Sequence, residues 1–317
     1  MKIVYNILLI ICLIQILSSC YKNSRDINSY KKGSTFISYE SDSSQTKPFP
    51  IVSECWNLIE EHLVCKTNNP DSVFVCVNLS TFQEENTFGK KGHGSMEWMS
   101  PHVMAKGTNN FIVLDNGNKK IYSIENNFIS FEKTSKISDA VNDVKTIKYP
   151  IIGYVSISPN KQSLIIYDIE KDLLIDSLSF VDETNNGNAS LYDFAWSIKN
   201  ENIVIAHQYS DQFSICSLDT NCKLTSINEY QTNSNYSQDK MIYSDVACGR
   251  YIYLLSQRNV DLEMFTGFSE IEIFDYKGVG IKKITLDIIA DKMVLDEKRN
   301  RIILSSEADA AIKIITL

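Results

Sequence analysis

The chain of 317 residues carries 31 basic and 39 acidic side chains, and its formal net charge is −8. This acidic balance argues against binding to nucleic acid and against broad electrostatic binding to anionic lipid surfaces. The length alone allows two domains, but repeat architectures are an exception to that estimate.

The N-terminus has the layout of a secretory signal, in which the positive charge of Lys2 precedes an apolar run at 7–17. The run is shorter than the about 20 residues that a transmembrane helix needs. Two serines before Cys20 resemble the lipobox of bacterial lipoproteins, and this resemblance implies cleavage before Cys20 and its acylation, for example with palmitate. We expect residues 1–19 to be a signal peptide and residues 20–34 to be a lipidated, flexible tether.

The residue after Cys20 is Tyr21, whereas aspartate at this position is associated with retention in the inner membrane. We therefore expect attachment to the outer membrane of a bacterial cell envelope, on its periplasmic or its surface side. No later apolar run approaches the length of a membrane span, so we expect the rest of the chain to be a soluble monomer.

The segment 191–229 sets the pattern for the whole chain. It contains four short apolar runs, at 191–197, 202–208, 212–218 and 223–229, joined by short polar connections. Runs and connections of this length favour antiparallel strands over helices. We interpret the segment as a four-stranded meander, which is one blade of a β-propeller.

The same pattern recurs along the chain with a period of about 40–50 residues, which is typical of propellers. Before the segment at 191–229, the predicted strands are 51–58, 60–66, 73–78 and 82–88, then 102–106, 111–115, 119–125 and 128–134, then 144–149, 151–158, 163–169 and 173–180. After it they are 242–247, 251–257, 270–275 and 281–286, then 290–295, 301–306 and 311–316. A β-sandwich is the alternative, but it rarely needs this many strands.

The last unit has only three strands, and an isolated strand signal at 35–39 has no unit of its own. A ring of sheets has to close, because an unpaired outer edge leaves backbone hydrogen bonds unmade. We therefore predict an all-β fold for residues 35–317, a propeller of six four-stranded antiparallel blades whose last blade is completed by the strand at 35–39. Residues 41–50 have the composition of a linker.

The cysteines allow two interpretations. Cys65 with Cys76, and Cys216 with Cys222, each flank a predicted hairpin turn, so each pair could form a disulfide in an exported protein. The interpretation that we favour is that these cysteines are free and buried in strands. Their spacing predicts no zinc site, and we expect no cofactor and no bound metal.

One stretch carries a family resemblance. Residues 88–98 read FGKKGHGSMEW, and together with the lipobox and the six strand units they resemble the TolB-like six-bladed propeller lipoproteins of Bacteroides-type bacteria. Members typically show a G-x-G-P-G-E-F-like turn after the first blade. Here both glycines, the glutamate and an aromatic residue are kept, His93 stands where proline is usual, and two residues are inserted. The resemblance implies the fold of the mature chain and no particular activity.

Strand order places the long connections on one face. In an up-and-down blade, the connection to the next blade and the connection between strands two and three emerge on the same side. We call this side the loop face, and the long predicted loops on it are 89–101, 135–143, 181–190, 230–241 and 258–269. Inter-blade loops are long in any propeller, but the last of the five joins strands two and three and is rich in apolar residues.

Loops on a rigid scaffold are where binding residues gather, so we expect the loop face to bind a protein partner or a small ligand. The candidate contact residues in these loops are His93, Trp98, Tyr236, Arg258, Phe265 and Phe268. The alternative is that the loop at 258–269 only packs on its own blade.

Two classes of function fit this sequence. The first is a binding or scaffold lipoprotein that uses its loop face. The second is a propeller enzyme, a hydrolase or a lyase, with its site in the central funnel. The glycine-rich stretch lacks G-K-[ST], and H-E-x-x-H and G-x-S-x-G are absent, so no catalytic residue is assigned. Three or more carboxylate or amide oxygens converging on a metal in the funnel would favour the enzyme.

Overall fold

The computed structural model of the chain describes most of the region after residue 55, together with the backbone of three short N-terminal strands. The described residues are 24–27, 36–39, 47–48, 56–59, 61–107, 110–125, 128–137, 140–158, 161–181, 193–232, 243–261, 266–286, 288–306 and 311–317. In these ranges no helix is long and apolar enough to span a membrane.

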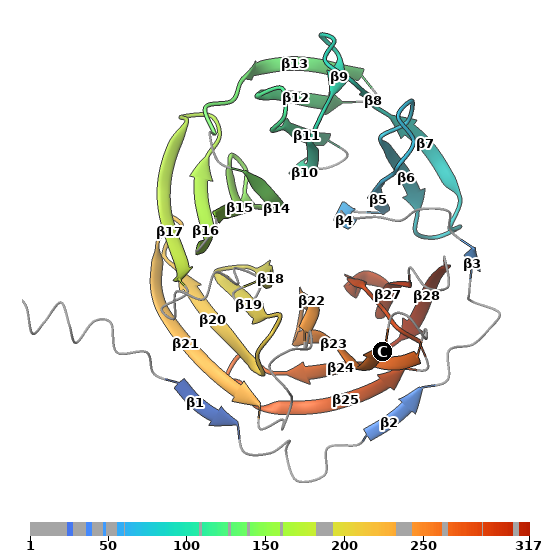
Figure 1. Ribbon diagram of the computed structural model, residues 1–317, viewed down its shortest axis with the longest axis vertical. Helices are drawn as coiled ribbons and strands as arrows, with labels where there is room; N and C mark the ends of the chain where they lie inside the picture. Colours follow the sequence, from blue (N-terminus) through green and yellow to red (C-terminus); the bar gives the residue numbers. More distant parts are fainter. Residues whose placement is uncertain are drawn as a thin grey trace, which may run out of the picture.

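Six antiparallel sheets form a closed ring about a central channel (Figure 1). Blade 1 consists of β4 (Trp56–Ile59), β5 (His62–Lys66), β6 (Phe74–Asn78) and β7 (Glu84–Phe88), and blade 2 of β10 (Pro101–Gly107), β11 (Asn110–Asp115), β12 (Lys120–Glu125) and β13 (Phe128–Thr134). Blade 3 consists of β14 (Val141–Lys148), β15 (Ile151–Ser158), β16 (Lys161–Asp168) and β17 (Leu173–Val181).

Blade 4 consists of β18 (Phe194–Lys199), β19 (Asn202–His207), β20 (Gln212–Leu218) and β21 (Leu224–Thr232), and blade 5 of β22 (Tyr243–Cys248), β23 (Ile252–Asp261), β24 (Thr266–Phe274) and β25 (Gly280–Leu286). Blade 6 contains β26 (Lys292–Asp296), β27 (Arg301–Ser306) and β28 (Ala311–Thr316). The first strand of each blade is innermost, and β26 contacts β4, which closes the ring. The predicted six-bladed propeller is confirmed.

The apolar runs become strands that are buried on both faces, because every blade packs between two others. The middle strands β11 and β27 are buried along almost their whole length, whereas the outermost strand β13 is mostly exposed. Six clusters of buried apolar side chains form the core, one between each pair of neighbouring blades. The core is therefore itself a ring, and the channel inside it is lined by both polar and apolar residues.

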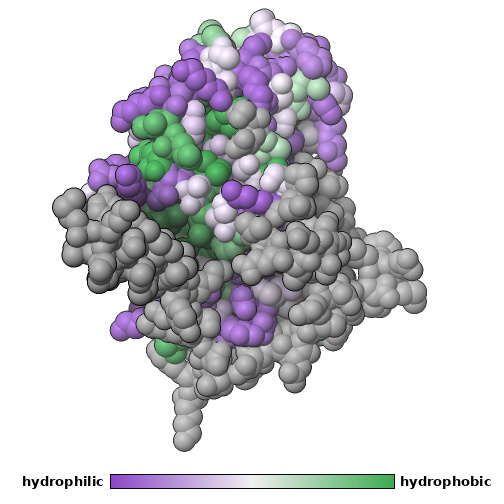
Figure 2. Space-filling view, turned by 60° about the vertical axis from the view of Figure 1, so that its left-hand side comes forward, coloured by the Kyte–Doolittle hydropathy of each residue, from purple (hydrophilic) through white to green (hydrophobic). Residues whose placement is uncertain are grey.

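The outer wall of the ring is mixed in character, as Figure 2 shows from one side. Leu173 and Leu174 of β17 are 54% and 55% exposed, and Phe131 of β13 is 52% exposed. Exposed apolar side chains of this kind are common on folded proteins, because there is too little polar surface to cover one completely.

The strand that completes blade 6 does come from the N-terminal region, but it is not the predicted one. β3 (Lys47–Pro48) pairs antiparallel with β28, at Pro48 with Ala311 and at Lys47 with Ile312. It lies in the segment that we read as a linker. Proline is compatible with this position, because an edge strand needs no amide donor on its outer side.

The predicted closing strand at 35–39 instead extends blade 5. β2 (Phe36–Tyr39) pairs parallel with β25, from Phe36 with Lys283 to Tyr39 with Leu286. The strand signal was correct, but sequence pattern does not say which sheet edge a short strand will join, so the assignment to blade 6 is wrong.

A further strand lies within the segment that we expected to be a tether. β1 (Ser24–Ile27) pairs parallel with β21 on the outside of blade 4. The three N-terminal strands therefore follow the outer edges of blades 4, 5 and 6 in turn (Figure 1).

Two predicted loops contain strands. Within 89–101, the short strands β8 (Lys90–Lys91) and β9 (Glu97–Trp98) pair in parallel. Within 258–269, β23 and β24 continue past the expected ends of the blade, with Arg258 opposite Phe268. The loop prediction at 258–269 is therefore wrong over the described residues, where the chain forms a long hairpin.

The cysteines of the two candidate pairs form no disulfide, as we favoured. Cys65, Cys76, Cys216 and Cys222 are all buried thiols. Cys65 and Cys76 lie on opposite faces of blade 1, because Cys65 packs in the cluster against blade 6 and Cys76 in the cluster against blade 2. Their side chains therefore cannot meet.

Candidate functional site

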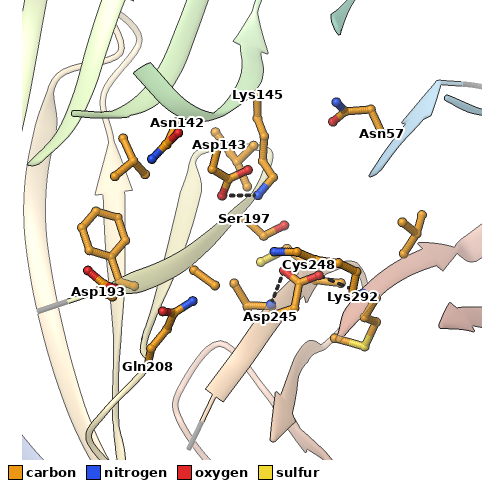
Figure 3. A pocket seen from close by; sticks show the side chains of 18 of the residues that line it. Asn57, Asn142, Asp143, Lys145, Asp193, Ser197, Gln208, Asp245, Cys248 and Lys292 are labelled. Atoms are coloured by element: carbon orange, nitrogen blue, oxygen red, sulfur yellow. Dashed lines mark hydrogen bonds and ion pairs between the residues drawn. The ribbon is translucent and has the colours of Figure 1, made fainter. Parts of the chain in front are cut away.

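A cavity of about 680 Å³ occupies the central channel. All six blades contribute polar side chains to its wall, and one from each blade is, in order, Asn57, His102, Asn142, Asp193, Asp245 and Lys292. Figure 3 shows several of these side chains around the channel.

Much of the polar wall lies at the loop-face end of the channel. Asn57, His102 and Asn142 are each the second residue of an innermost strand, and Lys292 is the first residue of β26. Every innermost strand begins where the chain arrives from the preceding blade, which is the loop face. Lys66 at the end of β5 also reaches the wall from this side.

One lysine of the wall is held by blades 3 and 4. Lys145 Nζ lies 2.9 Å from Asp143 Oδ2, donates to the carbonyl of Trp196, and stands 5.1 Å from the centre of the indole ring. The indole Nε1 in turn donates to the Asp143 carbonyl at 2.9 Å. The charge of Asp143 is thus balanced within the protein (Figure 3).

The carboxylate of Asp245 is held by backbone donors. Its Oδ1 accepts from the amide of Val246 at 2.9 Å, and its Oδ2 accepts from the amide of Met293 at 2.8 Å. Because Met293 belongs to β26, this buried side chain joins blade 5 to blade 6. Its role in the structure is to satisfy backbone amides at the start of a strand.

Asp193 differs from these two carboxylates. Its Oδ1 accepts a hydrogen bond from Gln162 Nε2, and no lysine or arginine in the described part of the chain forms an ion pair with it. Burial raises the pKa of Asp193 above the usual range of an aspartate. Next to it, the ring of Phe194 packs edge-on against Phe180 at 5.2 Å. The described residues around Asp193 therefore do little to stabilise its charge.

His102 is one of the buried polar residues of the wall. The side chain is 9% exposed, and its Nε2 has no hydrogen-bond partner among the residues that the structure describes. Burial, with a smaller contribution from the charge of Lys66, lowers the pKa of His102 to about 4. The ring is therefore neutral at neutral pH.

The one thiol of the wall is unreactive. Burial raises the pKa of Cys248 to about 12, so its side chain is a thiol rather than a thiolate at neutral pH. A nucleophilic cysteine needs the opposite shift. Among the described residues there is also no group of three or more His, Cys, Asp or Glu side chains that could hold a metal ion.

Trp98 is not the exposed contact residue that we predicted. It is fully buried between blades 1 and 2, with its ring 5.9 Å from that of Phe74 and 5.7 Å from that of Tyr122. The chain folds closely over the indole at Gly89, whose φ is +82° and where a Cβ would lie 2.1 Å from the ring. A side chain enclosed in this way cannot contact a partner.

The other candidate contact residues differ in their exposure and in whether their side chains are described. His93 is exposed, and Phe268 is half-buried on β24. Arg258 lies in β23, and its side chain is outside the described part of the structure, as are Tyr236, Phe265 and Cys20. None of the three candidates whose side chains are described, His93, Trp98 and Phe268, lines the central cavity.

The cavity residues were missed in the sequence because each one looks like an ordinary polar residue in or beside a predicted strand. In the structure they lie at or near the first positions of the innermost strands, but the predicted strands 51–58 and 144–149 do not place Asn57 and Asn142 there. Only the closed ring turns these six separate positions into one wall.

Comparison with known proteins shows the fold. No family model matches the chain, and no curated protein matches it. Among solved structures, a gluconolactonase from Xanthomonas campestris is similar with a TM-score of 0.54 and 9% identity, over 85% of this chain and 87% of that one.

Two further structures are similar at the same level. The β-propeller domain of Cps50 (Swd1) from Myceliophteria thermophila has a TM-score of 0.51 and 10% identity, over 90% of this chain and 99% of that one. A protein of Bacteroides fragilis NCTC 9343 has a TM-score of 0.51 and 11% identity, over 92% of this chain and 98% of that one. Identities this low establish the propeller and nothing about activity.

Proposed function

We propose that the protein is a binding propeller that holds a small polar ligand at the loop-face end of its central channel. The observation that carries this proposal is the cavity of about 680 Å³, to which all six blades contribute polar side chains. Its volume lies in the range of about 300–1,000 Å³ that is typical of small-molecule sites.

The fixed polar groups of the wall support binding over chemistry. Asp143 is balanced by Lys145, Asp245 is bonded to two backbone amides, and the thiol of Cys248 is protonated. Groups that are held in this way orient a ligand by hydrogen bonds without needing to exchange protons with it.

The second candidate is a propeller enzyme, a hydrolase or a lyase, and one observation favours it. Asp193 is a carboxylate with a raised pKa in a cavity wall, which is a common setting for a general acid or base. The two candidates differ in the fate of the ligand, because a binding protein returns it unchanged and an enzyme returns a product.

A plugged channel tests the site. Ile157 on β15 lines the cavity and is 38% exposed, so Ile157→Trp fills the mouth without overpacking the core. Ile227 on the outer strand β21 is also 38% exposed, which makes Ile227→Trp a matched control. We expect ligands that raise the thermal unfolding midpoint of the parent and the control to have no effect on Ile157→Trp. Equal shifts in all three proteins would place the ligand elsewhere.

We propose in addition that the propeller is a lipoprotein of the TolB-like group, attached to the outer membrane through acylated Cys20. The basis is the resemblance of residues 1–20 to a lipoprotein signal. Cys20→Ser should release the protein from the membrane fraction after cell disruption. Retention of this variant in the membrane would contradict the proposed anchor.

A further inference from the structure

Two parts of the cavity wall differ in charge. The carboxylate of Asp193 and the neutral amide of Gln208 belong to blade 4, whereas the ammonium groups of Lys292 and Lys66 belong to blades 6 and 1. In Figure 3, Lys292 extends its side chain into the cavity from β26, and Asp193 and Gln208 lie on the other side. A ligand in the cavity therefore meets a carboxylate at one end and ammonium groups at the other.

Among the described residues, the acidic region has no cation of its own. Asp143 has Lys145 and Asp245 has two backbone amides, but Asp193 has only the amide of Gln162 among the described donors. The neighbouring ring of Phe194 is apolar and lines the same cavity. A ligand ammonium group next to Asp193 would supply the missing charge, and the adjacent aromatic ring is compatible with a cation.

The basic region offers donors for an anion. An ammonium group has three N–H donors, so Lys292 and Lys66 can keep their contacts within the protein and still donate to a ligand. Both side chains reach the same cavity from adjacent blades, which places two positive charges on one side of it. A carboxylate is the simplest group that accepts from both.

We propose that the ligand is a small zwitterion whose ammonium group binds at Asp193 and whose carboxylate binds at Lys292 and Lys66. This inference rests on the proposed function, because it names the class of ligand for the same cavity. A molecule with both charges is bound at its two ends, and a molecule with one charge is bound at one end only.

Three probes of one chain length test the charge requirement. They are 6-aminohexanoate, hexanoate and hexylamine, each titrated into the parent protein by calorimetry at neutral pH. We expect 6-aminohexanoate to bind at least about tenfold more tightly than either singly charged probe, because a second charge-assisted contact is made.

Variants assign the two ends. Asp193→Asn should remove the advantage of 6-aminohexanoate over hexanoate and leave hexanoate binding unchanged. Lys292→Met should weaken hexanoate and 6-aminohexanoate and leave hexylamine unchanged. The exposed residues Asp71 and Lys90 lie outside the cavity, so Asp71→Asn and Lys90→Met are matched controls that should bind all three probes as the parent does.

The outcomes separate this inference from the proposed function. If neutral or singly charged molecules bind as tightly as 6-aminohexanoate and Ile157→Trp blocks them, the cavity is a binding site and the zwitterion proposal is wrong. If Asp193→Asn, shown to be folded by its circular dichroism, keeps the full preference for the zwitterion, the assignment of the ammonium end is wrong. If Ile157→Trp blocks none of the ligands that bind, the proposed function fails as well.

Discussion

His102, in the cavity wall, has a lower pKa in the folded protein than in the unfolded chain. In the unfolded chain its pKa takes the ordinary value of 6.5, whereas burial lowers it to about 4 in the folded protein. Above pH 6.5 both states are neutral at this residue and it contributes no pH dependence. As the pH falls from 6.5 towards 4, the unfolded chain gains a proton that the folded protein does not, so stability is lost across this window.

We therefore expect His102→Gln to flatten the acid side of the stability profile. The parent should lose up to about 3 kcal/mol of unfolding free energy from this residue between pH 6.5 and 4, and the variant should not. Urea denaturation at pH 7 and at pH 5 measures the difference. His93→Gln, at an exposed histidine, is the control, and an identical pH slope in the parent and His102→Gln would contradict the assignment.

Single residues were the hardest features to predict from the sequence. Trp98 stands among glycines and lysines, which indicates a loop, but the parallel pair β8–β9 turns its ring into the core. Asp193 falls within the predicted strand at 191–197 and looks like an ordinary polar residue of that strand. Each of the two residues differs from an ordinary surface residue in its burial and in the side chains that it contacts. Both properties depend on neighbouring blades, which the sequence pattern does not specify.

The packing of blade 3 against blade 4 depends on a glycine at position 153. Gly153 on β15 leaves room for Trp196 on β18, which is fully buried, and a Cβ at position 153 would lie 2.4 Å from the indole ring. Because Trp196 also bonds to Asp143 and packs under Lys145, the ring has no freedom to move aside.

Gly153→Ala should therefore destabilise the protein by about 1–3 kcal/mol, as expected for overpacking of a tight core. Gly107, at the end of β10, has open space where a Cβ would lie, with no atom within 4 Å, so Gly107→Ala is the control and should change stability little. Chemical denaturation of the two variants beside the parent measures both effects. A cost for Gly107→Ala as large as that for Gly153→Ala would show that the contact with Trp196 is not the cause.

The sequence predicts strands well where the apolar pattern repeats from blade to blade, and poorly where it does not. The strands of the blades follow alternating or continuous apolar runs, and their positions agree with the structure to within a few residues at most ends. β3 has only two residues, one of them proline, and so carries no pattern at all. The sequence indicates a loop at 258–269 because Arg258, Asp261 and Gly267 interrupt the apolar pattern there, whereas β23 and β24 pair across this segment in the structure.

Closure of the ring depends on side chains as well as on β3. Arg301 Nε bonds to Asp296 Oδ2 at 2.9 Å within blade 6, its Nη2 donates to the carbonyl of Leu79, and its guanidinium lies 4.8 Å from the ring centre of Phe82. Leu79 and Phe82 belong to the turn of blade 1. Arg301 therefore ties the last blade to the first.

Arg301→Met should lower the unfolding free energy by about 3 kcal/mol, because it leaves the buried carboxylate of Asp296 with one fewer cation and breaks the contact to blade 1. Lys199 also forms a cross-blade pair, with Glu297, but both side chains are about 40% exposed. Lys199→Met should cost less than about 1 kcal/mol. Equal effects in urea denaturation would indicate that burial does not decide the contribution.

The sequence predicts the six-bladed ring, but it does not predict which N-terminal strand completes blade 6. Six units with similar strand spacing leave few alternatives to a propeller, because each unit alone exposes two apolar faces that only neighbours can cover. The cavity follows from that ring, yet its charges could be placed only once the first residues of all innermost strands were known to share one end of the channel.

The path of β1, β2 and β3 has a consequence for biosynthesis. Ser24 pairs with Glu229, roughly two hundred residues later in the chain, and Pro48 pairs with Ala311 at a still greater separation. The earliest-made strands thus have no partner until blades 4, 5 and 6 have been synthesised. Assembly that must wait for such distant pairings is slow, and until then these bare edges need protection from other chains.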